Sequence, residues 1–326
     1  MLTRDTLEKQ QIYYYFLALF LGALAGIFSP SIASSFSAII SITLAILMYS
    51  MFSQIPFTSL KKSFVNKRFL AALLTTNFLV VPLVVWLLTR LLPDNSSMLL
   101  GVFLVLLTPC IDYVIVFTAL GRGNEKLMLL ATPILLLVQM LLLPLYLTLF
   151  IGEQAAAIIE IRPFIETFLV IILLPLIVSV CTQLLATKKE VAQKVLDGSA
   201  WLPVPFMAFT LFIIVASQIT KVLTFIENIL IVIPIYILFM LIMPWIAKSI
   251  ATLFRLDIGA GRALIFSSFT RNSLVVLPLA LALPSAVQTF VAAIIVTQTI
   301  VEIIMELLYI RLVPAFILRD KKAENA

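Results

Sequence analysis

The feature that most constrains this chain is a series of ten apolar stretches, each long enough to cross a bilayer. A membrane-spanning helix needs about 20 apolar residues, because lipid cannot form hydrogen bonds with backbone N–H and C=O groups. The sequence therefore predicts an all-α polytopic membrane protein whose main partner is the lipid bilayer. The predicted spans are 12–28, 36–52, 69–89, 98–120, 127–150, 164–186, 201–219, 228–250, 263–283 and 286–309.

Composition excludes several classes of function. The 326 residues are 63% hydrophobic and 12% charged, too few charged side chains to coat a soluble domain, which carries about 25%. The connections are too short for a catalytic domain, and no GxxxxGK[ST] phosphate loop occurs. The chain contains no histidine and no GxSxG motif, so it lacks the catalytic residues that metalloproteases and serine hydrolases need. We therefore predict a protein that is not an enzyme and has no cofactor.

The basic residues are sorted by side of the membrane. Of the 22 lysines and arginines, all but Arg90, Arg162, Lys221 and Arg271 lie before the first predicted span or at or beyond the end of an even-numbered one. The positive-inside rule then places both termini in the cytoplasm, as a multi-pass protein of the cell (inner) membrane. This sidedness accounts for the net charge of +6 without a nucleic-acid partner.

The two halves of the chain resemble each other. Cutting near residue 160 leaves five spans in 1–160 and five in 161–326, so the halves enter the membrane in opposite orientations, as in many secondary transporters. Thr108 and Thr270 lie 162 residues apart, as do Pro82 and Pro244. The tripeptide Ser53-Gln54-Ile55, at the end of the second span, recurs at the end of the seventh as Ser217-Gln218-Ile219. We therefore predict two inverted five-helix repeats.

Spans four and nine, 98–120 and 263–283, hold residues that are unexpected in a membrane helix. Proline lacks an amide hydrogen and clashes with the preceding turn, so Pro109 predicts a kink or break. Interrupted helices of transporters bind substrate and coupling ion near the midplane. We expect both spans to be interrupted and to cross. Their embedded polar residues are Cys110 and Asp112 in span four, and Thr270, Arg271, Asn272 and Ser273 in span nine.

Asp112 and Arg271 are the charged residues of these two spans. A charged side chain at the bilayer centre costs about 2.5–3.5 kcal/mol on insertion scales, so neither should face lipid. We predict that they face each other or a water-filled cavity between the helices. The alternative is a permanent ion pair that locks the repeats without touching substrate. For Pro109 the alternative is an ordinary kink, and for Cys110 it is packing as a small hydrophobic residue.

Span three offers a further polar group. Asn77 follows Thr75 and Thr76 and precedes Pro82, which places amide and hydroxyl oxygens at another possible break. These oxygens suit an ion, and hydrogen bonding between helices is the alternative.

Span ten carries a periodic set of polar residues. Gln298, Glu302 and Glu306 recur every four residues and therefore share one helix face. Glu302 is a candidate proton carrier, whereas we expect Glu306 to lie at a solvated helix end near the cytoplasm.

These residues resemble the superfamily of bile acid:sodium symporters and arsenical-resistance exporters. The segment CIDYVIVF from Cys110 to Phe117 is similar to the exporters' CIxxVIVW pattern, whose cysteine is associated with trivalent metalloids. Asn77 followed by Pro82 matches an N/Q-x4-P signature in the third helix of both branches. Arg271-Asn272-Ser273 aligns with the NN or QN step of their ninth helix. The resemblance covers the chain in topology.

The resemblance in span four implies an exporter of arsenite or antimonite that works by alternating access and is coupled to Na⁺ or H⁺. In this hypothesis Cys110 offers a soft thiol to the metalloid and Asp112 carries the coupling charge. The predicted substrate-binding residues are Cys110, Asp112, Arg271, Asn272 and Ser273. The predicted ion-binding residues are Asn77, Pro109, Thr270, Asn272 and Glu302.

The sequence departs from the exporter pattern in two places: Asp112 could restore the carboxylate missing from one of them, and the other, at Arg271, favours a different substrate. Leu274 stands where the exporters carry a glutamate, and Arg271 replaces the first asparagine of the pair. A neutral metalloid hydroxide gains nothing from a fixed cation, whereas an anion does. The alternative is therefore a sodium-coupled symporter of small organic anions, in which Arg271 binds a carboxylate while Asn77, Asn272 and Ser273 hold Na⁺ through oxygen ligands.

Overall fold

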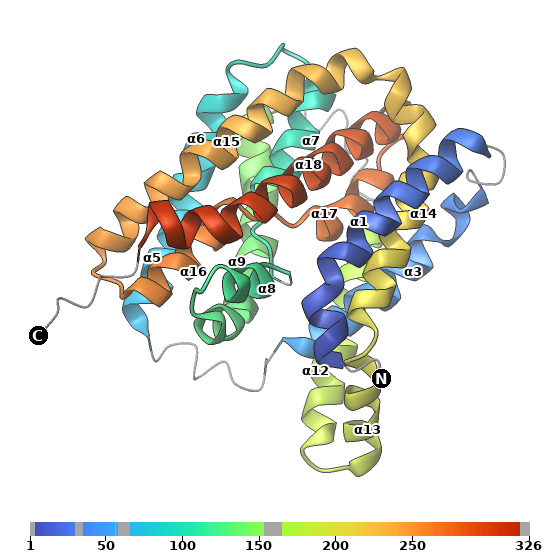
Figure 1. Ribbon diagram of the computed structural model, residues 1–326. Coiled ribbons are helices and arrows are strands. Elements are labelled where there is room, and N and C mark those ends of the chain that lie inside the picture. Colours follow the sequence, from blue (N-terminus) through green and yellow to red (C-terminus); the bar gives the residue numbers. More distant parts are fainter. Residues whose placement is uncertain are drawn as a thin grey trace, which may run out of the picture. The chain divides into compact units, whose positions relative to one another are not determined.

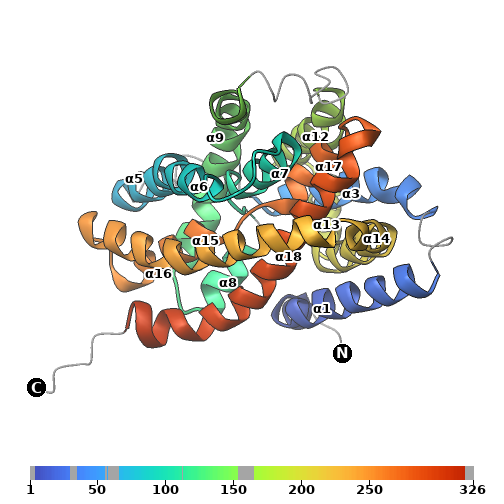
Figure 2. The same ribbon diagram turned by 90° about the horizontal axis from the view of Figure 1, so that it is seen from above.

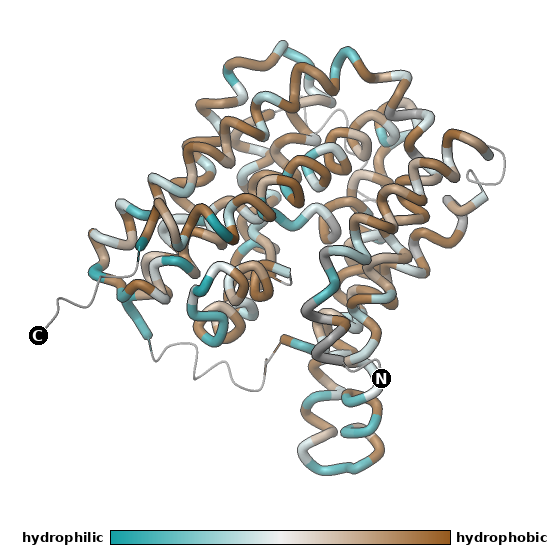
Figure 3. The backbone as a smooth tube through the Cα atoms, viewed as in Figure 1, coloured by the Kyte–Doolittle hydropathy of each residue, from teal (hydrophilic) through white to brown (hydrophobic). Residues whose placement is uncertain are grey.

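The structure is a computed structural model that describes residues 4–29, 35–55, 57, 66–111, 113–152 and 165–319, and every regular element in these ranges is a helix. Hydrophobic residues run along most of the helices, and hydrophilic ones gather at α13 (Glu190–Ser199) (Figure 3). Five described helices are long and apolar enough to cross a membrane, and a bent pair makes a sixth. The predicted helical membrane protein is thus confirmed, while the ten-span count stays a prediction.

The remaining elements follow the predicted spans closely (Figure 1). In chain order they are α1 (Arg4–Phe28), α3 (Ser37–Gln54), α5 (Lys67–Thr75), η2 (Thr76–Val80), α6 (Val81–Thr89), α7 (Ser96–Leu106), α8 (Val114–Leu120), α9 (Glu125–Ile151), η3 (Phe168–Leu173), α12 (Leu174–Ala186), α14 (Pro203–Thr224), α15 (Ile226–Leu253), α16 (Ile258–Phe269), α17 (Ser273–Leu281), α18 (Ser285–Leu312) and η4 (Val313–Ile317). The elements η2, η3 and η4 are π-helices.

The chain forms two compact units, each made from both halves of the sequence. The first unit comprises Met1–Thr58, Ala156–Ile229 and Leu274–Val296. The second comprises Ser59–Ala155, Leu230–Ser273 and Thr297–Ala326. Most of α18 beyond its first turns belongs to the second unit, together with both of its glutamates.

In the first unit α1 packs along α14, and two views show these helices side by side (Figure 1, Figure 2). Gly22 and Gly26, about one turn apart, lie on the α1 face that meets α14. A Cβ at Gly22 would lie 2.7 Å from the carbonyl oxygen of Phe212, and one at Gly26 would lie 2.5 Å from that of Ala216. The glycines therefore let the two backbones approach closely, as small residues do between membrane helices.

In the second unit two prolines deprive a helix carbonyl of its usual donor, and a tyrosine supplies the missing hydrogen each time. Pro82 cannot donate to the carbonyl of Phe78, which accepts from the Tyr146 hydroxyl of α9 at 2.6 Å. Pro244 of α15 cannot donate to the carbonyl of Met240, which accepts from the Tyr309 hydroxyl of α18 at 2.7 Å. Both buried carbonyls are thereby satisfied.

The helix boundaries differ from the predicted ones in several places. The connection after span six contains α13, whose mixed polar sequence suggested no span. Helix α16 begins at Ile258, so Arg262, which we assigned to a loop, is a buried helical residue. Helix α14 continues to Thr224, beyond the Ser217-Gln218-Ile219 tripeptide that we placed at its end. The proposed cut near residue 160 lies outside the described residues.

Candidate functional site

Spans four and nine are both interrupted, as the sequence predicts. Span four ends as a helix at Leu106 and resumes at Val114, giving α7 and α8. Span nine ends at Phe269 and resumes at Ser273, giving α16 and α17. The four orphan carbonyls at the end of each half-helix need other partners.

The two interruptions meet in the second unit through a short antiparallel pairing of Pro109 with Arg271. The Cys110 N–H donates to the Thr270 carbonyl at 3.1 Å, and the Asn272 N–H donates to the Thr108 carbonyl at 2.8 Å. The pairing thus satisfies backbone groups that the helices leave open, in a region where most side chains are buried.

The Arg271 side chain lies in the second unit with no exposed surface. Its Nη2 donates to Asn77 Oδ1 at 2.9 Å and to the carbonyl of Ser267, and its Nη1 contacts the carbonyl of Leu106 at 3.4 Å. The guanidinium carbon lies 5.7 Å from the ring centre of Phe239, a distance at which a cation is attracted to an aromatic face. Each of these hydrogen-bond acceptors is a neutral oxygen.

Asn77 is oriented by its own donors. Its Nδ2 donates to the carbonyl of Leu73 at 3.1 Å and to Ser267 Oγ at 3.0 Å. The amide oxygen therefore faces the Arg271 guanidinium. Asn77 lies in η2, and π-helical turns inside α-helices are frequent at functional sites.

Glu302 contacts the backbone of the second interruption. Its Oε2 accepts from the Arg271 N–H at 2.8 Å and from the Gln298 amide, and its Oε1 lies 2.6 Å from the Tyr113 hydroxyl. The same hydroxyl lies 2.9 Å from the Arg271 carbonyl oxygen. This carboxylate therefore links α18 to both interruptions.

The expectation that Glu306 lies at a solvated helix end is wrong. Its side chain has no exposed surface, and its Oε1 forms a hydrogen bond with the Thr270 hydroxyl. Gln298, Glu302 and Glu306 are spaced four residues apart on α18, so they share the helix face that is turned to the interior. Because α18 continues to Leu312, Glu306 lies within the helix and not at its end.

Cys110, Ser273 and Asp112 are three further predicted site residues, and their outcomes differ. The Cys110 thiol is buried and not in a disulfide, and the residue joins the pairing through its backbone. Ser273 begins α17, and its buried hydroxyl has no hydrogen-bond partner among the described residues. Asp112 lies outside the described residues, so its pairing with Arg271 stays a prediction.

The sequence analysis did not identify three residues that contact Asn77, Arg271 or Glu302. Ser267 contributes its hydroxyl and carbonyl, Leu106 contributes a carbonyl, and Tyr113 contributes a hydroxyl. Ser267 precedes Arg271 by four residues, but Arg271 lies beyond the end of α16, so helix periodicity did not predict their contact. Backbone acceptors such as Leu106 have no side-chain signature.

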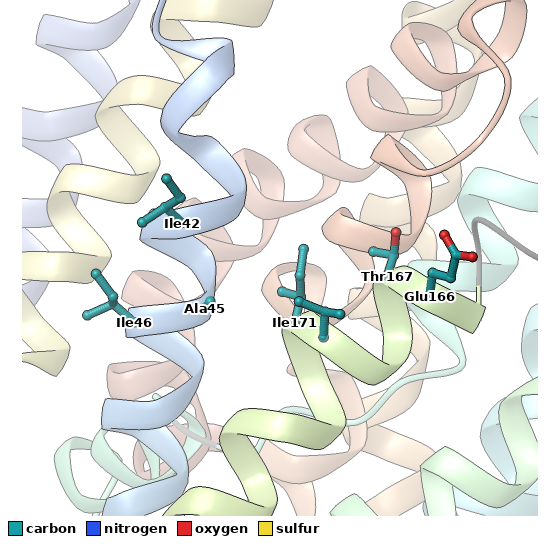
Figure 4. Close-up of a pocket in the computed structure, with 7 residues that line it drawn as sticks. Ile42, Ala45, Ile46, Glu166, Thr167 and Ile171 are labelled. Atoms are coloured by element: carbon teal, nitrogen blue, oxygen red, sulfur yellow. The ribbon is translucent and has the colours of Figure 1, made fainter.

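The first unit contains a separate cavity of about 470 Å³. Figure 4 shows Ile42, Ala45 and Ile46 of α3 on one side and Glu166, Thr167 and Ile171 on the other. None of the predicted site residues that the structure describes lines this cavity.

The class defined by this fold and site is a helical membrane protein with two interrupted helices that meet among buried polar groups, an arrangement typical of secondary transporters. The model of the Sodium Bile acid symporter family matches residues 41–225, more than half of the chain. The chain belongs to this family of transporters, and its membership suggests sodium-coupled transport. No curated protein matches the sequence.

Proposed function

We propose that this protein is a sodium-coupled, alternating-access carrier of small organic anions. The observation that supports it best is the meeting of the two interrupted spans at Pro109 and Arg271, with Asn77 and Glu302 bonded to the second. Paired interruptions of this kind supply half-helix ends and free carbonyls to substrates and coupling ions. The family match is the second support.

An inverted repeat of five helices is part of this proposal, with ten spans and both termini in the cytoplasm of the cell membrane. The pairing is symmetric under the offset of 162 residues, because Cys110 to Thr270 and Asn272 to Thr108 are equivalent hydrogen bonds. The tyrosine contacts are related in the same way, since Phe78 and Met240 are 162 residues apart and Tyr146 and Tyr309 are 163 apart. Each compact unit also takes segments from both halves.

We place the substrate carboxylate at the N-terminal end of α17. A helix N-terminus presents free N–H groups and the positive end of the helix dipole to an anion. Ser273 begins this helix with a buried hydroxyl that has no partner among the described residues. This assignment differs from the sequence-based one, in which Arg271 binds the carboxylate, because the Arg271 guanidinium already donates to oxygens of its own chain.

Uptake into proteoliposomes tests the function. The full-length protein should accumulate a labelled bile acid under an inward sodium gradient and not under an equal potassium gradient. Ser273→Ala should raise the KM for the anion about tenfold, corresponding to roughly 1.4 kcal/mol of lost binding. Ser249→Ala is the matched control, since that exposed hydroxyl donates to the Trp245 carbonyl of its own helix. Equal uptake in both gradients would contradict the sodium coupling.

Arsenite or antimonite efflux is the other function predicted from the sequence, and the family match lends it no support. Arsenite accumulation in cells with and without the protein separates the two hypotheses. A fall on expression that Cys110→Ser abolishes would favour efflux. Unchanged accumulation together with sodium-driven bile acid uptake would favour the symporter.

A further inference from the structure

Two half-helices of the second unit direct their C-terminal ends at one cation. Leu106 is the last residue of α7, and Ser267 lies in the last turn of α16. Carbonyls at these positions have no partner within the helix, and they carry the negative end of the helix dipole. In transporters, such half-helix ends coordinate sodium ions. Here both carbonyls contact the guanidinium of Arg271.

A side-chain oxygen completes this oxygen cluster. Asn77 Oδ1 lies 2.9 Å from Arg271 Nη2, and the two hydrogen bonds made by Asn77 Nδ2 prevent the amide from turning its oxygen away. The cluster therefore consists of two carbonyl oxygens and one amide oxygen, all neutral. Hard cations prefer such oxygen ligands.

We propose that Arg271 is a resident cation that fills a cluster of oxygens otherwise suited to a sodium ion, so that these oxygens bind no sodium in the native protein. This inference rests on the proposed function. If the protein is a sodium-coupled carrier, one site fewer binds a sodium ion in each transport cycle. The positive charge at the two half-helix ends is then permanent and does not depend on the sodium concentration.

Removing the guanidinium should create a sodium site. In Arg271→Gln the carbonyls of Leu106 and Ser267 and the amide oxygen of Asn77 lose their cation and are left buried, which favours entry of a small cation. A ligand that binds only the native state raises its stability, by about 2.7 kcal/mol at 100 times the dissociation constant. Sodium should therefore stabilise this variant more than it stabilises the native protein.

The experiment is thermal unfolding of the purified full-length protein in sodium chloride and in potassium chloride of equal concentration, without substrate. The difference in Tm between the two salts should be larger in Arg271→Gln than in the native protein, and it should saturate with sodium. Adding Asn77→Ala to Arg271→Gln should remove the gain. Arg271→Lys, which keeps the charge, should show no gain.

Arg262→Gln is the matched control. Arg262, in α16, is also buried and donates to backbone carbonyls, those of Arg122 and Leu318, which are not the oxygens of the proposed cluster. It should show no added sodium response. An equal gain in Arg262→Gln and Arg271→Gln, or no gain in a folded Arg271→Gln, would overturn the proposal.

If Arg271→Gln does not fold, a second measurement tests the proposal without that variant. In the otherwise native chain, Asn77→Ala should lower Tm without changing the sodium concentration that gives half of any sodium stabilisation. A several-fold increase in that concentration would show that native Asn77 binds sodium and would overturn the proposal. Since neither measurement uses a transported anion, failure of the proposed function would appear only in the uptake assay.

Discussion

The guanidinium of Arg271 donates a 2.9 Å hydrogen bond to the amide oxygen of Asn77, which lies in the π-helix η2, 194 positions away in the chain. This contact joins a π-helical turn of one span to the interruption of another. An arginine in a membrane interior is costly unless it is paired or hydrogen-bonded. Here the cost is offset by oxygens of the same unit, and the arginine in turn holds two half-helix ends together.

Asn77→Ala should destabilise the protein. The substitution removes the acceptor of Arg271 Nη2 and leaves part of a buried cation without a partner, which costs about 1–3 kcal/mol or more for a charged group. Thermal unfolding in detergent measures the loss. Asn77→Asp keeps an oxygen at the same place and should lose less. An Asn77→Ala variant as stable as the native protein would show that the contact contributes nothing.

Glu302→Ala should lower bile acid uptake at least about tenfold, or roughly 1.4 kcal/mol. The carboxylate accepts from the Arg271 N–H at 2.8 Å and lies 2.6 Å from the Tyr113 hydroxyl, so its removal frees both interruptions. Flux into proteoliposomes, normalised to the amount of inserted protein, measures the effect. Glu190→Ala, on the exposed helix α13, is the control and should transport normally. Normal flux in Glu302→Ala would exclude this positioning role.

Tyr146→Phe and Tyr309→Phe should destabilise the protein by similar amounts, about 1–3 kcal/mol each. Each change leaves one carbonyl, of Phe78 or of Met240, without the donor that replaces the missing proline N–H. Tyr13→Phe is the control, because Tyr13 is 76% exposed. Thermal unfolding of the three variants provides the comparison. A large loss in only one of the two buried positions would argue against their equivalence in an inverted repeat.

Gly26→Val should weaken the packing of α1 against α14. A Cβ at this glycine would lie 2.5 Å from the Ala216 carbonyl oxygen, so the two helices must move apart. A typical overpacking cost is about 1–3 kcal/mol. Gly198→Ala is the control, since nothing lies within 4 Å of a Cβ built there. The expected result is a lower Tm for Gly26→Val only, and equal Tm values would show that the close approach is not needed for stability.

The sequence predicts the positions of the helices well because their signal is the length of each apolar stretch, and it locates both interruptions because Pro109 and Arg271 are out of place in such stretches. The sequence does not predict contacts in which a site residue is bonded to a backbone group or to a residue far away in the chain. The Leu106 carbonyl cannot be recognised from its residue type, and Glu306 was assigned to solvent because its depth depends on how far α18 continues. The helix α13 was missed because amphipathic polar sequence carries no membrane signal.

An experimental structure at a resolution that separates a guanidinium from a metal ion tests the central claim most directly. In sodium-free buffer, the guanidinium of Arg271 should contact the carbonyls of Leu106 and Ser267 and the amide oxygen of Asn77, and adding sodium should leave these contacts unchanged. Continuous helices across residues 107–113 and 270–272, or a sodium ion bound by these oxygens with the arginine turned away, would contradict the account.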